Sequence, residues 1–123
     1  MKFTKQMIVT AILSLFLCSN PAQAVVTLPV GFSQVLVAGG ITAPTTMAIA
    51  PDGRFFVAQQ NGLLRVVKND TLLTQPFLSL SVNIDGERGL LGVALDPNFA
   101  SNQYIYVCYT IASGLFNRVS RFT

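Results

Sequence analysis

A charged loop flanked by glycines is the part of this sequence best suited to contact a ligand. Residues 86–99 read GERGLLGVALDPNF, and the apolar residues 90–95 have the length of a buried strand. Glycine permits positive φ angles and a close approach of the backbone to a ligand. We therefore take Glu87, Arg88 and Gly89 as candidate binding residues at the start of a strand. The alternative is an ordinary turn whose charges keep it hydrated.

Several kinds of chemistry are excluded by residues and motifs that the chain lacks. The sequence contains no histidine, which removes histidine bases and histidine metal ligands from these residues. The same absence leaves Cys108 without an activating partner, so it is a poor nucleophile candidate. Cys108 lies in the β-rich run YIYVCY, where a thiol behaves as a small apolar side chain, and we expect it in the core. No CxxC pair, P-loop or GxGxxG motif supports a zinc, nucleotide or dinucleotide site.

The charges beyond residue 24 are almost balanced. Six basic side chains accompany five acidic ones between residues 25 and 123. No stripe of basic residues interleaved with aromatic residues is present, although such a stripe is the usual mark of a nucleic-acid surface. We therefore predict no nucleic-acid partner.

The first 24 residues have the three parts of a signal peptide. Two lysines precede the apolar residues 7–17, and residues 22–24 (AQA) supply a small-x-small cleavage pattern. The apolar run is about eleven residues long, shorter than the roughly 18 that a membrane-spanning helix needs. We expect a signal peptide at residues 1–24, a mature domain at residues 25–123, and no stable membrane anchor after cleavage. This interpretation predicts an exported protein, either periplasmic or extracellular.

The mature domain contains an internal repeat of short strands and turns. Both copies read strand, turn, strand, turn, strand, and the equivalent alanines Ala48 and Ala94 are about 46 positions apart. The predicted strands are residues 47–50, 55–58 and 63–67 in the first copy and residues 92–95, 104–108 and 117–122 in the second. A repeat of roughly 40 to 50 residues with Gly, Pro, Asn and Asp turns is typical of β-propeller blades.

We therefore predict an all-β fold that contains about the first two blades of a β-propeller. Residues 71–80 would form the outer, fourth strand of the first blade, where Pro76 is tolerated because an edge strand needs fewer backbone donors. Propellers use roughly 4 to 8 blades, so we expect these residues to be the N-terminal part of a longer protein. A compact β-sandwich of about 100 residues is the alternative fold, although it does not require two similar units.

Three segments resemble the beginning of the glucose/sorbosone dehydrogenases. They are MAIAPDGRFFVAQQNGLLRVV (residues 47–67), GERGLLGVALDPNFASNQYIYVCYT (residues 86–110) and NRVSRFT (residues 117–123). The resemblance implies a soluble, exported, six-bladed propeller that uses pyrroloquinoline quinone (PQQ) and calcium. It also implies oxidation of an aldose sugar at C1, with a separate electron acceptor as the second small-molecule partner.

The resemblance assigns a role to one loop of this chain. The family position that matches Glu87 holds a glutamine or an acid that lies against the cofactor, so Glu87, with Arg88 and Gly89 beside it, is implied to contact PQQ. Many members have histidine where this chain has Asp96. The catalytic histidine and the principal cofactor and calcium ligands of the family belong to later blades, which implies no catalytic residue here and an inactive isolated chain. The competing interpretation is a non-catalytic secreted propeller that binds a partner, because the hedgehog-interacting proteins resemble the family and keep an ERGLL-like loop.

The signal-peptide interpretation makes a direct prediction about the N-terminus. Cleavage after Ala24 should release a soluble chain that begins at Val25, because the AQA pattern places the cut there. Intact-mass analysis of the exported protein measures this directly. A membrane-bound form that still begins at Met1 would contradict the prediction.

Overall fold

The computed structural model of the protein describes residues 26–123. The predicted signal peptide, residues 1–24, and the predicted cleavage before Val25 lie outside that range. The described residues belong to two units, of which residues 26–34 contain a turn and residues 35–123 hold the strands described below. Among the described residues, no helix is both long enough and apolar enough to cross a membrane.

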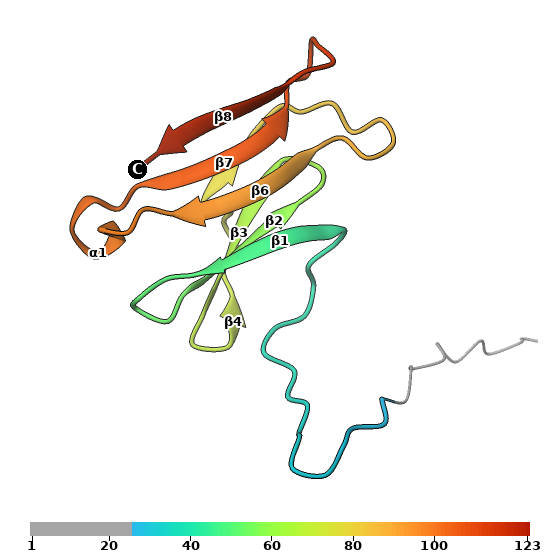
Figure 1. Cartoon of the computed structure of the whole chain (residues 1–123), viewed down its shortest axis with the longest axis vertical. Helices are drawn as coiled ribbons and strands as arrows, with labels where there is room; N and C mark the ends of the chain where they lie inside the picture. The colour runs from blue at the N-terminus through green and yellow to red at the C-terminus, as the bar shows by residue number, and fades with distance from the viewer. Residues whose placement is uncertain (1–25) are drawn as a thin grey trace, which may run out of the picture. The chain divides into compact units, whose positions relative to one another are not determined.

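Residues 35–123 form two antiparallel sheets that follow one another along the chain (Figure 1). The first sheet contains β1 (Pro44–Ile49), β2 (Phe55–Gln59), β3 (Leu63–Lys68), β4 (Thr71–Leu72) and β5 (Leu78–Ser79). The second contains β6 (Leu90–Leu95), β7 (Ile105–Thr110) and β8 (Asn117–Phe122), with the short helix α1 (Phe99–Asn102) between β6 and β7. Consecutive strands are neighbours in each sheet except β4 and β5, which both pair with β3. The all-β prediction and the order of strands in both copies of the repeat are confirmed.

The tight turn between β1 and β2 shows why this sequence reverses direction here. Gly53 has φ +83°, a backbone conformation that side-chain-bearing residues rarely adopt. The N–H of Ala50 donates to the carbonyl of Arg54 at 2.8 Å, and the Arg54 guanidinium donates to the Asp52 carboxylate at 2.8 Å. That hydrogen bond from Arg54 holds the pKa of the Asp52 carboxyl below its ordinary value.

The predicted continuous outer strand at residues 71–80 is wrong, because the structure divides it into β4 and β5. Both pieces pair with β3, and the N–H groups of Leu73 and Phe77 each donate to a β3 carbonyl at 2.9 Å. Pro76 lies between the two pieces and has no N–H to donate. The chain therefore bends away from β3 before Pro76 and resumes its pairing just after it.

A carboxylate organises the loop between β6 and β7, where the sequence alone predicted an irregular connection. Asp96 accepts hydrogen bonds from the N–H of Asn98, the side chain of Asn102 and the hydroxyl of Tyr106, all at 2.9 Å. These donors, led by Asn102, hold the pKa of the Asp96 carboxyl below its ordinary value. Asp96 therefore stabilises the turn that contains α1, which gives this departure from the family pattern a structural role.

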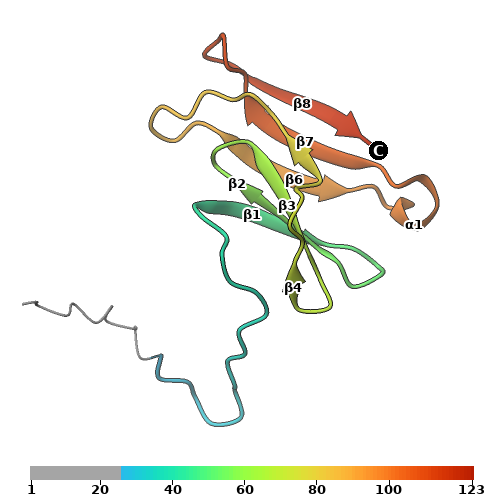
Figure 2. The same ribbon diagram turned by 180° about the vertical axis from the view of Figure 1, so that it is seen from behind.

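The apolar core lies between the two sheets and follows the two-residue period of the strands. On the first sheet it comprises Phe56 and Ala58 of β2 with Leu64 and Val66 of β3, and on the second sheet Leu90 of β6 with Ile105, Val107 and Tyr109 of β7. The first strands of the two sheets, β1 and β6, lie side by side in both ribbon views (Figure 1 and Figure 2). The hydroxyl of Thr45 on β1 donates to the carbonyl of Leu90 at 2.7 Å and joins the sheets directly.

The alternate side chains point to the outer faces of the sheets. On the first sheet, Met47, Phe55, Val57 and Val67 line an apolar hollow of about 420 Å³ together with residues 37–41. On the second sheet, Cys108 lines a shallower hollow with Val119. The prediction that Cys108 belongs to the core is therefore wrong: the thiol is half-buried, because its neighbours Val107 and Tyr109 occupy the inner face.

Substitution of two leucines, one buried and one partly exposed, tests which positions belong to the core. Leu64 is fully buried between the sheets, whereas Leu73 is 40% exposed. Leu64→Ala should lower the free energy of unfolding by about 2 to 5 kcal/mol, and Leu73→Ala should change it by about 0.5 kcal/mol or less. Urea unfolding of both variants supplies the comparison. Similar losses in the two would place the core elsewhere.

Candidate functional site

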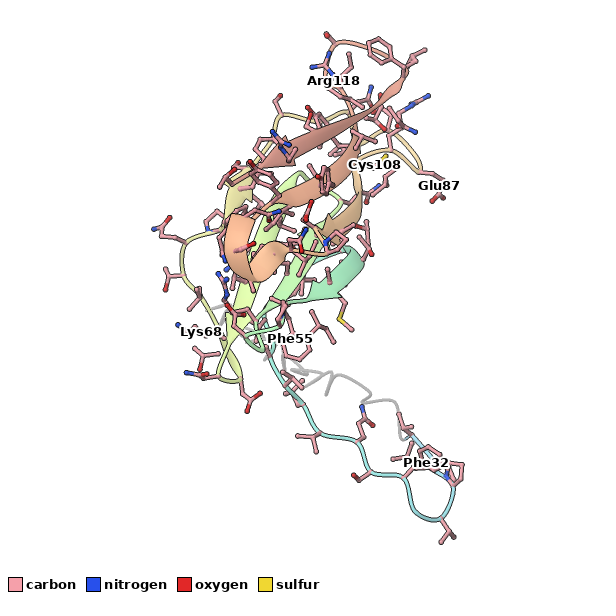
Figure 3. The ribbon with its side chains drawn as sticks, turned by 60° about the vertical axis from the view of Figure 1, so that its left-hand side comes forward. Phe32, Phe55, Lys68, Glu87, Cys108 and Arg118 are labelled. Carbon is pink, nitrogen blue, oxygen red and sulfur yellow. The ribbon has the colours of Figure 1, made fainter. Side chains whose placement is uncertain are left out.

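Glu87, Arg88 and Gly89 lie together in the loop that leads into β6. We call residues 85–89 the Glu87 loop. Glu87 is exposed and projects from the ribbon in Figure 3. No hydrogen bond or ion pair with another residue between 26 and 123 engages its carboxylate. Glu87 is therefore the candidate residue whose side chain is most available to a ligand.

Arg88 is more constrained than Glu87. Its side chain is half-buried, and its Nη1 donates to the carbonyl of Asp85 at 3.3 Å. The backbone N–H of Arg88 also donates to that carbonyl, at 3.4 Å, and closes a turn around Gly86, which has φ +62°. One nitrogen of the Arg88 guanidinium thus holds the turn, while its other N–H groups remain available to an acceptor.

A side chain of the first sheet holds the Glu87 loop, and sequence reasoning did not identify it. Gln60 follows β2, and its Nε2 donates to the carbonyl of Gly86 at 2.9 Å and to the carbonyl of Arg88 at 3.0 Å. These two carbonyls belong to the residues immediately before and after Glu87. Gln60 is 26 residues from Gly86 in the sequence, and no motif links the two positions.

Gly89 is required by the close approach of two backbones. A Cβ atom at Gly89 would lie 2.3 Å from the carbonyl oxygen of Gln60, and its φ of +142° is rarely available to other residues. The N–H of the next residue, Leu90, donates to that same oxygen at 3.2 Å, and the carbonyl of Gly89 accepts from Thr110 at 2.9 Å. The structure therefore gives Gly89 a packing role, and its contact with a ligand stays a prediction.

The charges of the loop define what it can bind. Asp85 and Glu87 contribute two carboxylates and Arg88 one guanidinium, so the loop carries one net negative charge. An anionic ligand would meet repulsion from Glu87 and attraction from Arg88. Within residues 26–123, no group of three or more His, Cys, Asp or Glu side chains could hold a metal ion. The unpartnered carboxylate of Glu87, next in the sequence to the Arg88 guanidinium and on a backbone held by Gln60, is available to a polar ligand.

The sequence of residues 41–123 matches the profile of the family described as Glucose / Sorbosone dehydrogenase. The chain belongs to the glucose/sorbosone dehydrogenase family. The family resemblance seen in the sequence is thus confirmed, and the match contains the whole of the Glu87 loop.

Two solved structures are similar to this member of the glucose/sorbosone dehydrogenases. A protein from Thermus thermophilus described as a putative glucose dehydrogenase is 39% identical with a TM-score of 0.65, and its alignment covers 71% of this chain and 26% of that one. The PQQ-bound aldose sugar dehydrogenase of Streptomyces coelicolor is 31% identical with a TM-score of 0.59 and the same coverage. The two sheets are therefore part of a propeller and not a separate β-sandwich, and the chain spans about a quarter of the length of these relatives.

A third relative has a name from a different class of protein. The Hedgehog-interacting protein of Mus musculus is 29% identical over 83 residues, which are 60% of this chain and 12% of the mouse protein. Membership of the family therefore leaves the contact between Glu87 and a cofactor as a prediction.

The packing role of Gly89 can be tested against its neighbour in the same loop. Gly89→Ala should lower the free energy of unfolding by about 3 kcal/mol, because backbone strain and a clash with the Gln60 carbonyl act together. Gly86→Ala should cost only about 1 to 2 kcal/mol, since a Cβ there meets no atom within 4 Å and only the positive φ opposes it. Urea unfolding of both variants measures the difference, and equal losses would contradict the close approach.

Proposed function

We propose that this chain supplies the first two blades of an exported propeller that oxidises an aldose sugar at C1 with PQQ as its cofactor. The observation that carries the proposal is the exposed, unpartnered carboxylate of Glu87 on a loop held at both of its flanking carbonyls. The family and the PQQ-bound Streptomyces coelicolor relative support the choice of chemistry. Export rests on the signal-peptide pattern of residues 1–24.

The residues of this chain take a supporting part in the proposed reaction. The chemistry supplied by PQQ, when bound, would be that of a hydride acceptor for the sugar C1, and calcium would supply a Lewis acid. A general base must also remove the proton of the C1 hydroxyl, and the chain contains no histidine to do so. Glu87 would orient the cofactor and contribute a local field, and Arg88 would offset the negative charge of Glu87. The catalytic base, the calcium ligands and the site for the separate electron acceptor would belong to other blades.

Under this proposal, the carboxylate of Glu87 makes the affinity for PQQ depend on the charge at position 87. A glutamine at this position would offer two N–H donors and no charge, whereas Glu87 offers only acceptors and repels an anionic quinone. Arg88 lies next in the sequence, and its guanidinium is tied to the loop by one nitrogen only. The affinity for PQQ should therefore respond to the charge at position 87 in a predictable direction.

The similarity to the mouse Hedgehog-interacting protein favours a second candidate function. Under this alternative, the propeller binds another molecule and performs no redox chemistry, and the Glu87 loop contributes to a binding surface. The two candidates differ in one measurable property, which is the binding of PQQ by a propeller that contains this loop.

The experiment that tests the proposal places residues 41–123 in the matching segment of the Streptomyces coelicolor enzyme. The chimaera should reduce an artificial electron acceptor with an aldose only after PQQ and calcium are added, while residues 1–123 alone should remain inactive. The unmodified Streptomyces coelicolor enzyme is the control for assay conditions. A folded chimaera that binds no PQQ would overturn the proposal and favour the binding module.

Two substitutions of Glu87 in the chimaera separate the effect of its charge on PQQ affinity from its orienting role in the reaction. Glu87→Gln should strengthen PQQ binding about fivefold, because removal of one charge near an anion is worth about 1 kcal/mol in a hydrated site. Glu87→Ala should weaken cofactor-dependent activity and leave the free energy of unfolding within about 0.5 kcal/mol, since the side chain is exposed. PQQ titration of the three proteins measures the affinity and reduction of an artificial acceptor measures the activity; identical dissociation constants and identical rates would remove Glu87 from the site.

A further inference from the structure

We propose that Gln60 is the positioning residue that sets the direction in which Glu87 is presented to a cofactor. This inference deepens the proposed function and rests on it for the identity of the ligand. The positioning role itself is inferred from the hydrogen bonds that Gln60 donates to the Glu87 loop, and it can be tested without any ligand.

One side-chain amide fixes the backbone on both sides of Glu87. The Nε2 of Gln60 has two hydrogens, and they are directed to the carbonyls of Gly86 and Arg88 at 2.9 and 3.0 Å. Two peptide planes meet at the Cα of Glu87. Gln60 holds the first through the Gly86 carbonyl, and the N–H of Arg88 holds the second by donating to the Asp85 carbonyl at 3.4 Å, while the bond from Gln60 to the Arg88 carbonyl fixes the next plane along the chain. Because the planes set the direction of the Cα–Cβ bond, Gln60 and this turn together determine where the Glu87 carboxylate can reach.

The backbone of Gln60 is held between the residue that precedes β1 and the first residue of β6. Its N–H donates to the carbonyl of Ala43 at 3.0 Å, and its own carbonyl accepts from Leu90 of β6 at 3.2 Å. The preceding residue, Gln59, is 2% exposed, and its Nε2 donates to the Thr42 carbonyl at 2.6 Å. A side chain that starts from such a fixed backbone can hold its partners in one geometry.

The same hydrogen bonds control which groups the loop presents to an anion. Free carbonyl oxygens at Gly86 and Arg88 would repel an anionic quinone, because each bears a partial negative charge. Gln60 donates to both of them, so the charged groups left to meet the ligand are the side chains of Asp85, Glu87 and Arg88. Loss of the Gln60 donors would both loosen the loop and expose two acceptors to the cofactor.

The chain offers a matched control for this side chain. Gln103 follows α1 at the other end of β6, and its Nε2 also donates to two carbonyls, those of Phe99 at 2.8 Å and Ala100 at 3.4 Å in α1, while its Oε1 accepts from Arg54 at 3.4 Å. A Gln→Glu substitution at either position removes the same two donors and places a carboxylate against two carbonyls. Only the substitution at Gln60 should affect the Glu87 loop.

The first measurement is hydrogen–deuterium exchange of the full 123-residue chain. In Gln60→Glu, the N–H groups of Arg88 and Leu90 should exchange at least about tenfold faster, as expected when two hydrogen bonds that hold the loop are lost. In Gln103→Glu they should exchange as in the unchanged chain. Gln60→Met, which has a similar length and no charge, should reproduce the effect if the charged variant fails to fold. Unchanged exchange in both Gln60 variants, or an equal rise in Gln103→Glu, would overturn the inference.

The second measurement is PQQ titration of the chimaera. Gln60→Glu should raise the dissociation constant about tenfold, and Gln103→Glu should leave it unchanged. Faster exchange of the loop without a change in PQQ affinity would overturn the cofactor part of the inference. If the unchanged chimaera binds no PQQ but the N–H groups of its Glu87 loop still exchange slowly, the proposed function is contradicted. The geometric role of Gln60 is then still supported.

Discussion

Apolar packing between the two sheets is the constraint on which the rest of the structure depends. Leu90 is the residue where this core meets the candidate site, because its side chain is fully buried and its N–H donates to the backbone of Gln60. The Glu87 loop leaves the core at that point and is tied back to the first sheet by Gln60 and Gly89. The loop therefore keeps its shape only as long as the two sheets remain in contact, which couples the geometry of the site to the stability of the core.

The strands could be predicted from the sequence because their signal is local. Short apolar runs rich in aromatic and β-branched residues, such as residues 55–58 and 104–108, with turn residues around them, indicate strands without reference to any other part of the chain. The period of the repeat then indicates blades, and the specific GERGLLG segment indicates the family. The placement of Glu87, Arg88 and Gly89 on one loop was also predictable, because the three residues are consecutive in the sequence.

The features that sequence reasoning missed depend on contacts between distant residues. The hydrogen bonds of Gln60 join positions 26 and 28 residues apart, and the role of Asp96 as an acceptor depends on Asn102 and Tyr106 reaching it. Cys108 was wrongly predicted to lie in the core, because composition alone does not show which of two alternating sets of side chains faces the core. A pattern in the chain can show that a residue lies in a strand, but the neighbouring sheet decides which side is buried.

The interruption at Pro76 has a consequence for the outer boundary of the first sheet. A long, regular strand at that boundary would offer a continuous row of free N–H and C=O groups, onto which a strand of another molecule could add. Here β4 and β5 are each two residues long and are separated by a bend with a proline. The boundary therefore presents only short, discontinuous stretches of backbone, which protects this side of the sheet against fibre-like growth from one molecule to the next.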